Sequence, residues 1–287
     1  MPSIRMHLFM LTATLTMVGC ASGNVLNEPL VRVVLPDQVD FVPLNPARGD
    51  ASPKAGVLWG DIRANVPSGV FLKFADGFSS PPHIHNITYR AVVISGHLHN
   101  DDPDAAMLWM PPGSFWTQPA GEVHITAAKS GAPATAFLEI QTGPYLVRHP
   151  DQAFDNGEQA INVVTSNLVW LDASASRWIS VSANNEPGTV SLSHLWGTPG
   201  SGLPAASMIR IRPGGQLTLT GAKSLKMVVV SGQLDYSHDG SNRSGVLPAG
   251  AYIDSDAGVT HSLGCVASTV CLAYVRSEGM LDFRSIH

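Results

Sequence analysis

The sequence predicts an all-β protein in which one barrel-like or sandwich-like unit occurs twice in tandem. After residue 20 the chain consists of short strand-like runs between glycine and proline turns, and no segment keeps an apolar period of 3.6 residues. With 27 Gly, 21 Pro and only 14% charged residues, the composition excludes a coiled coil or helical bundle, and 44% hydrophobic residues exclude a disordered chain. The strands predicted in the first half are Val57–Ile62, Val70–Phe74, Tyr89–Ser95, Met107–Met110, Val123–Ala127 and Ala136–Gln141.

The first residues of the chain have the pattern of a secretory signal. One positive charge, Arg5, precedes an apolar run from Leu8 to Val18, and small residues follow it. The run is too short to span a bilayer as a helix. We therefore predict that residues 1–19 are a signal peptide of the lipoprotein type that is removed from the mature protein.

The end of this segment, Met17–Cys20, resembles a bacterial lipobox, in which the cysteine is lipidated and becomes the mature N-terminus. The resemblance implies that the protein is anchored through the lipidated Cys20 to a membrane of the bacterial cell envelope. Ala21, where an Asp would signal retention in the inner membrane, implies the outer membrane, with the protein facing the periplasm. The alternative is an ordinary signal that is cleaved nearby and leaves Cys20 free or removes it.

The second half of the chain repeats the first at a nearly constant offset of 136 or 137 residues. The matched residues are Leu58-Trp59-Gly60 with Leu195-Trp196-Gly197, Val92–Gly96 with Val228–Gly232, Gly113 with Gly250, Gly121 with Gly258, and His124 with His261. A period of this length indicates a duplicated domain and not a solenoid. We predict one domain at residues 24–147 and a second at residues 158–287, with the polar stretch Arg148–Gly157 as the linker.

The first copy contains three histidines whose spacing suits a metal site. His83 and His85 are two residues apart, so on a strand both side chains point to the same face, which inside a barrel is the lumen. The turn at Pro119–Gly121 brings the strand that contains His124 back toward them. Three neutral imidazoles suit Zn, Fe, Ni or Cu. We predict that they bind one divalent transition metal (Fe, Zn, Ni or Mn); the alternative places the H-x-H pair in an exposed loop beside two prolines.

The spacing around these histidines matches two motifs of a known family. Gly77 is followed after five residues by H-x-H, and Gly113 opens a G-x5-P-x-G-x2-H run that ends at His124. The sequence thus resembles the cupin superfamily over residues 57–144 and, more weakly, over 194–281. The resemblance implies two tandem jelly-roll barrels (double-stranded β-helices), a bicupin similar to uncharacterised bacterial cupins related to the ChrR-type sensor cupins.

Two residues depart from the cupin motifs. Tyr89 stands where cupins usually have a glutamate ligand, and Ala128 stands at an asparagine position. We predict that Tyr89 is catalytic, as a proton donor or base beside the metal; the alternatives are a fourth ligand or an aromatic residue that only packs in the lumen. Glu122 and Glu139 are candidate substitutes for the missing carboxylate.

The second copy lacks the metal motif. The positions that correspond to the H-x-H pair and to the tyrosine are Leu219 or Thr220, Gly221 or Ala222, and Leu225 or Lys226. His261 alone remains, so we expect a degenerate domain with a structural or interface role. His97 and His99 form another H-x-H pair in the first copy, but they lead into a polar turn-rich stretch and are expected to lie in a solvated hairpin.

The two cysteines of the second copy, Cys265 and Cys271, flank five small or apolar residues that suggest the end of a hairpin. Export implies an oxidising compartment, so a structural disulfide between them is expected. The alternative, a metal site that joins them to His261, lacks the C-x-x-C spacing of such sites.

The motifs leave two functions open. The first is a metalloenzyme, a dioxygenase or a lyase, that acts on a small oxygen-bearing molecule in the first barrel, because a missing fourth ligand leaves room for substrate. The alternative is a non-catalytic envelope sensor or a protein that binds a metal or small ligand; a purely structural barrel would require three coincidental histidines. The net charge of −5 argues against nucleic acid as a partner. The resemblance to cupins also implies a homodimer.

Overall fold

The protein is described by a computed structural model that covers residues 31–176, 179–181, 188–241 and 244–286 of the 287-residue chain. The predicted signal peptide of residues 1–19 and the predicted lipidation site Cys20 lie outside the described residues. Strands are the dominant regular structure of the described chain. Its helices are the short 3-10 turns η1 (Pro36–Gln38), η2 (Pro46–Ala51), η3 (Pro150–Gln152) and η4 (Thr165–Asn167). None of these helices has the length and apolar character needed to cross a bilayer.

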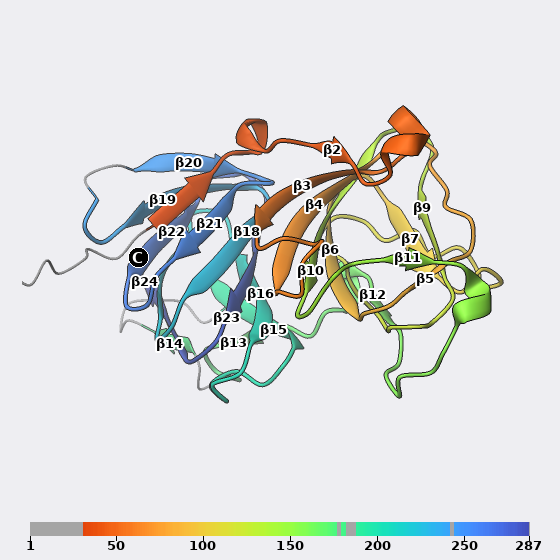
Figure 1. Cartoon of the computed structure of the whole chain (residues 1–287). Coiled ribbons are helices and arrows are strands. Elements are labelled where there is room, and N and C mark those ends of the chain that lie inside the picture. Colours follow the sequence, from red (N-terminus) through yellow and green to blue (C-terminus); the bar gives the residue numbers. More distant parts are fainter. Residues whose placement is uncertain (1–30, 177–178, 182–187, 242–243, 287) are drawn as a thin grey trace, which may run out of the picture.

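The first barrel consists of one large sheet and two small ones. From edge to edge the large antiparallel sheet contains β12 (Ile161–Val163), β8 (Phe115–Gln118), β6 (Tyr89–Ser95), β10 (Ala134–Ile140), β4 (Ser68–Phe74), β3 (Lys54–Trp59) and β2 (Val42–Pro43). The small sheets pair β11 (Val147–Arg148) with β5 (Ile84–His85), and β7 (Leu98–Asp101) with β9 (Ile125–Ala128). In Figure 1 the small sheets lie at the outer end of the molecule, across the barrel from the large sheet.

The second barrel is built from two large sheets. The first contains β1 (Val31–Val34), β21 (Tyr252–Ser255), β18 (Leu225–Ser231), β23 (Cys271–Ser277), β16 (Ala205–Ile211), β15 (Val190–Trp196) and β13 (Leu171–Asp172). The second contains β14 (Ile179–Val181), β24 (Leu281–Ile286), β17 (Gln216–Gly221), β22 (Thr260–Cys265), β19 (Gln233–His238) and β20 (Gly245–Pro248). Together with the first barrel, this architecture confirms the predicted all-β fold of two tandem jelly-roll barrels.

The two seven-stranded sheets meet in the middle of the molecule (Figure 1). Buried side chains from both sheets form one apolar cluster there, in which the ring centroids of Phe137 and Tyr274 are 5.1 Å apart and Trp59 stacks on Tyr252 at 5.4 Å. Aromatic side chains bury large apolar areas, so this interface stabilises the pair of barrels as one unit.

Two strands extend the barrel opposite to the one in which the predicted domain boundaries place them. β1, which lies within the predicted first domain, extends the sheet of the second barrel, with Val31 opposite Ser255. β12, which lies within the predicted second domain, extends the sheet of the first barrel, with Ile161 opposite Thr117. Each strand covers a sheet edge that would otherwise expose unpaired backbone groups. The hydrophobic pattern of a strand does not encode which edge it covers.

Strands of the two barrels correspond at the predicted offset. β6 and β18, for example, begin at Tyr89 and Leu225, and each is followed by a glycine, Gly96 or Gly232, with φ of 70° or 80°. A side chain at Gly96 would lie 2.8 Å from the backbone of Ala134, so both the dihedral and the space require glycine.

One predicted strand is absent. Residues 107–109 are irregular, and of the predicted strand Met107–Met110 only Met110 forms a bridge, with Leu98. The preceding stretch turns instead, because Asp102 accepts hydrogen bonds from the backbone of Asp104 and Ala105. The other predicted strands of the first copy are found with ends shifted by up to three residues.

Candidate metal centre

The structure brings His83, His85 and His124 together inside the first barrel. His83 and His124 lie opposite each other in a β-bridge, and each backbone N–H donates to the carbonyl of the other at 3.0 Å. His85, two residues after His83, points to the same side, as its spacing on a strand requires. One ring nitrogen of each histidine lies within 4.8 Å of those of the other two. Among the described residues they form the single group of three or more candidate metal ligands.

Backbone carbonyls fix the orientation of all three rings. The Nδ1 atoms of His83, His85 and His124 lie 3.0, 3.1 and 3.1 Å from the carbonyl oxygens of Pro81, Leu146 and Glu122. A carbonyl only accepts hydrogen bonds, so each Nδ1 carries the proton. Each Nε2 is then unprotonated, and this is the tautomer in which a histidine can bind a metal through Nε2. The residues present therefore fit a transition metal.

The environment keeps the three imidazoles neutral. Burial lowers the pKa of His124 to about 3 and the pKa of His85 well below its ordinary value, and neighbouring histidines lower both further. Burial also lowers the pKa of His83. At neutral pH no proton has to leave these side chains before a cation binds.

Tyr89 lies beside the histidines, and its shorter hydrogen bond is to Asn100 and not to a histidine. Its hydroxyl donates to Oδ1 of Asn100 at 2.8 Å, and its Oη lies 3.5 Å from Nε2 of His124. Asn100 is held in turn by the hydroxyl of Thr126 and by the side chain of Gln118. Burial raises the pKa of Tyr89, so the phenol keeps its proton.

The sequence reasoning missed Tyr145. Its ring stacks on His85 with centroids 4.3 Å apart, and its hydroxyl lies 3.1 Å from Nε2 of His85. The side chain of Asn86 donates to the carbonyl of Pro144 and accepts from the N–H of Leu146, which fixes the backbone on both sides of the tyrosine. The only sequence signal was a tyrosine in the proline-containing turn after the last strand of the first copy.

A cavity of about 420 Å³ opens onto the site. His83, His85, Tyr89 and Tyr145 lie along its wall, whereas His124 is buried behind them. The remaining walls are mostly apolar and include Leu72, Phe74, Phe78, Trp116 and Leu138. A volume of this size is typical of sites for small molecules.

The two candidate carboxylates do not join the histidines. Glu139 lies on the opposite face of β10 from Leu138, where it accepts a hydrogen bond from the hydroxyl of Tyr274 at 2.7 Å in the interface between the barrels. The side chain of Glu122 is exposed. Neither belongs to the group of candidate ligands, so a carboxylate does not replace the usual cupin glutamate in the described structure.

The prediction for the second H-x-H pair was half wrong. His97 is exposed, but His99 is 1% exposed, because β7 pairs with β9 and the following loop covers it. The N–H of Leu108, in this loop, donates to Nδ1 of His99.

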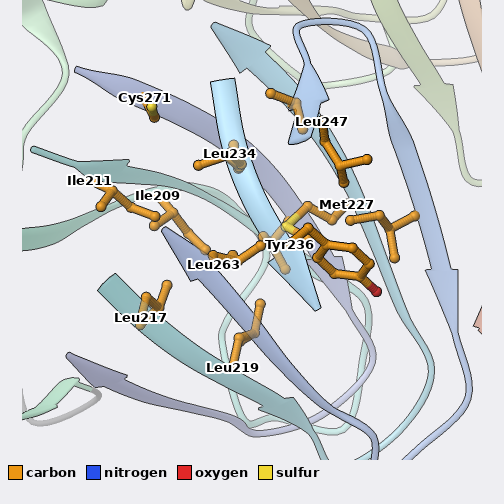
Figure 2. Close-up of a cluster of buried hydrophobic side chains, with 14 of the residues drawn as sticks. Ile209, Ile211, Leu217, Leu219, Met227, Leu234, Tyr236, Leu247, Leu263 and Cys271 are labelled. Atoms are coloured by element: carbon orange, nitrogen blue, oxygen red, sulfur yellow. The ribbon is translucent and has the colours of Figure 1, made fainter. Parts of the chain in front are cut away.

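In the second barrel the corresponding place is filled. Leu219 lies opposite His261, as His83 lies opposite His124 in the first barrel. Nδ1 and Nε2 of His261 are both engaged, at 2.9 Å each, by Tyr236 and Ser255. Figure 2 shows Leu219 and Tyr236 among the aliphatic side chains that pack the interior of this barrel. This arrangement agrees with the expected loss of the metal motif.

Cys265 and Cys271 lie at the ends of β22 and β23 and are joined by a disulfide bond with an S–S distance of 2.06 Å. Bonded to each other, they do not offer thiolates to a metal site with His261.

Comparisons with known proteins extend over nearly the whole chain. The profile of a protein family described as a domain of unknown function, DUF4437, matches residues 32–284. No curated protein matches the sequence. Three solved structures are similar in fold at low sequence identity.

A Nostoc punctiforme protein described provisionally as a dioxygenase has a TM-score of 0.62 and 13% identity, and the match covers 87% of this chain and 83% of that one. Salicylate 1,2-dioxygenase from Pseudoaminobacter salicylatoxidans, in adducts with gentisate, has a TM-score of 0.55 and 14% identity over 87% and 81%. Oxalate decarboxylase from Lactobacillus farciminis, in a formate complex, has a TM-score of 0.51 and 10% identity over 86% of both chains. Together these likenesses show that the chain shares the fold of these proteins, in agreement with the tandem-barrel fold that its motifs predict.

Proposed function

The chain belongs to the DUF4437 family, and on this premise we propose that it is a metal-dependent enzyme, dioxygenase-like or lyase-like, for a small oxygen-bearing molecule. One observation carries the proposal. Three neutral histidines each donate Nδ1–H to a backbone carbonyl, which leaves their Nε2 atoms unprotonated, and His83 and His85 line a cavity of about 420 Å³. The similarity to ChrR-related sensor cupins stays a prediction from the motifs.

The donor set narrows the choice of metal. Imidazoles suit Zn, Fe, Ni and Cu, whereas Mn prefers carboxylate and carbonyl oxygens. Because the cluster contains no carboxylate among the described residues, it favours Fe, Zn or Ni over Mn. When bound there, such an ion supplies Lewis-acid chemistry and, in the case of iron, redox chemistry.

The residues around the histidines bind the substrate and control its protons. The apolar cavity walls exclude water from the site and favour a substrate with an apolar body. Tyr89 is a neutral hydroxyl that shares its proton with Asn100, so it is suited to donate that proton to a substrate oxygen that binds near His124. This assigns Tyr89 the role of proton donor and not of base.

The comparison proteins suggest substrates to test. Salicylate and gentisate, named with one neighbour, are aromatic acids that match the apolar walls, and oxalate, named with another, is smaller and wholly polar. We expect the cavity to prefer an aromatic or aliphatic acid over oxalate.

The first experiment is the metal content of the mature chain, purified without an affinity tag of histidines and measured by mass spectrometry. We expect about one transition-metal ion per chain and its loss in the His83→Ala/His85→Ala double variant. His97→Ala, at an exposed histidine outside the cluster, is the matched control and should retain the metal. A wild-type chain without metal, even after incubation with Fe, Zn or Ni, would refute the proposal.

The second experiment separates an enzyme from a binding protein. Metal-loaded protein is incubated with salicylate, gentisate and oxalate, and oxygen uptake and products are measured beside the double variant. Turnover that the variant loses supports the enzyme. Saturable binding without turnover would favour the alternative, a non-catalytic envelope sensor or ligand-binding protein.

We also propose that the mature protein is attached to the bacterial outer membrane through a lipid on Cys20 and faces the periplasm. The disulfide between Cys265 and Cys271 supports an oxidising compartment. Incorporation of labelled palmitate into the full chain, absent in Cys20→Ala, would test the anchor. A homodimer stays a prediction from the resemblance to cupins, and light scattering of the mature protein tests it.

A further inference from the structure

We propose that Tyr145 is the fourth protein ligand of the metal centre and binds the ion through its phenolic oxygen. This inference rests on the proposed function, because it requires an ion held by His83, His85 and His124. It assigns the ligand position that glutamate occupies in the cupin motif to a residue outside that motif, 56 positions after Tyr89.

The distance between the hydroxyl of Tyr145 and the ring of His85 is that of two ligands on one ion. Oη of Tyr145 lies 3.1 Å from Nε2 of His85. Two donor atoms that each lie about 2.1 Å from a metal, at tetrahedral or octahedral angles, are about 3.0–3.4 Å apart. The Tyr145 hydroxyl therefore donates its hydrogen bond to Nε2 of His85, the ring nitrogen that is unprotonated in this tautomer and would bind the metal.

The backbone around Tyr145 is fixed before any ion binds. The Asn86 side chain holds Pro144 and Leu146 with hydrogen bonds of 3.0 and 2.9 Å, and the N–H of Tyr145 donates to the carbonyl of Ile62 at 2.7 Å. The β11–β5 pairing then places Val147 opposite His85. A ligand held this firmly loses little freedom on binding, so the geometry of the site is preorganised.

Tyr89 is the less suitable of the two tyrosines. Its hydroxyl already donates to Oδ1 of Asn100 at 2.8 Å and lies farther from its histidine, 3.5 Å from Nε2 of His124. For Tyr145 the structure gives one hydrogen-bond partner of the hydroxyl among the described residues, the nitrogen of His85. The two tyrosines thus have different roles, Tyr145 as ligand and Tyr89 as proton donor.

The charge of the site also favours a phenolate. Three neutral histidines leave the full charge of the ion in an apolar cavity, where uncompensated charge is costly. On binding, the O–H bond of Tyr145 breaks, the oxygen bonds to the ion and the proton passes to water at the cavity mouth.

The test uses ferric iron as the probe, because ferric phenolates absorb strongly in the visible region and ferric imidazole complexes do not. The mature chain, Tyr145→Phe and Tyr89→Phe are each freed of metal and loaded with ferric citrate. Iron content, the visible spectrum and far-ultraviolet circular dichroism are then recorded. We expect a charge-transfer band in the wild type and in Tyr89→Phe, and no band in Tyr145→Phe, which keeps its ring and its stacking on His85. Iron should bind the Tyr145→Phe protein about tenfold or more weakly.

The outcomes separate this inference from the proposed function. Three outcomes would overturn the role of Tyr145 and leave the histidine site intact. The wild-type protein holds iron without the band, the band persists in Tyr145→Phe, or only Tyr89→Phe loses it. A wild-type protein that holds no iron or other transition metal overturns both. If Tyr145→Phe does not fold, Asn86→Ala serves in its place, and a band of unchanged intensity in that variant contradicts the proposal.

Discussion

Arg276 and Glu139 face each other across the interface between the two barrels, with Nε of the arginine 3.6 Å from Oε1 of the glutamate. Their side chains are 4% and 1% exposed, so the pair is shielded from water. Tyr274 adds a hydrogen bond to the same carboxylate at 2.7 Å. A glutamate on a strand of the barrel that contains the histidine cluster thus serves the contact with the other barrel.

Replacement of Arg276 by Met is expected to lower the free energy of unfolding by about 3–5 kcal/mol, because it leaves a buried carboxylate without its main counter-charge. Urea unfolding of both proteins measures this loss. Adding Glu139→Gln to the variant removes the unpaired charge and should recover part of the lost stability. Metal content should not change, since the pair lies on the face of β10 away from the cavity. A loss below about 1 kcal/mol would show that the charge is solvated.

The sequence predicts what is local or repeated. Strand periodicity and one turn predict that the side chains of His83, His85 and His124 converge. The constant offset between the halves predicts two barrels. The role of Tyr145 depends on a contact with His85, 60 residues earlier, that no periodicity encodes. The burial of His99 depends likewise on the loop that covers it. Local patterns therefore reveal the candidate histidine ligands, whereas the residues that surround and fix them emerge only from the tertiary structure.

Replacement of Asn86 by Ala is expected to weaken metal binding by about tenfold, because it frees the backbone on both sides of Tyr145 and the carbonyl of Leu146 that orients His85. Titration of metal-free protein with Zn²⁺ in a calorimeter measures the affinity. Asn156→Ala, which removes a surface amide hydrogen-bonded to Thr88 and Glu158, is the matched control. Equal affinities for the two variants would contradict a role of Asn86 in the metal site.

The metal-free protein is expected to lose stability as the pH falls from 7 to 5. The pKa of His124 is about 3 in the fold and 6.5 in a free chain. At a pH between these two values, His124 is protonated in the unfolded chain but neutral in the fold, so a lower pH favours unfolding. The effect of one such histidine is about 2 kcal/mol at pH 5 relative to pH 7.

This pH effect is isolated by comparing the chelator-treated wild type with His124→Gln in urea at pH 7, 6 and 5. The variant removes the titrating group, so its stability should fall less steeply with acid than that of the wild type. Parallel slopes would mean that His124 titrates in the fold as it does in the unfolded chain.

His261 should contribute to stability and not to metal binding, although it occupies the position of His124 in the second barrel. Its two ring nitrogens bridge Tyr236 on β19 and Ser255 on β21, and Leu219 stands where a second ligand would be needed. Replacement by Ala removes the hydrogen bonds of His261 to the buried Tyr236 hydroxyl and to Ser255, which keeps its bond to the carbonyl of Asp256, and it opens a cavity. Together these losses should lower the free energy of unfolding by about 2–4 kcal/mol. The variant should still bind one metal ion per chain. A fall in metal content with unchanged stability would mean that the ion is bound in the second barrel, through His261, and not by the three histidines of the first barrel.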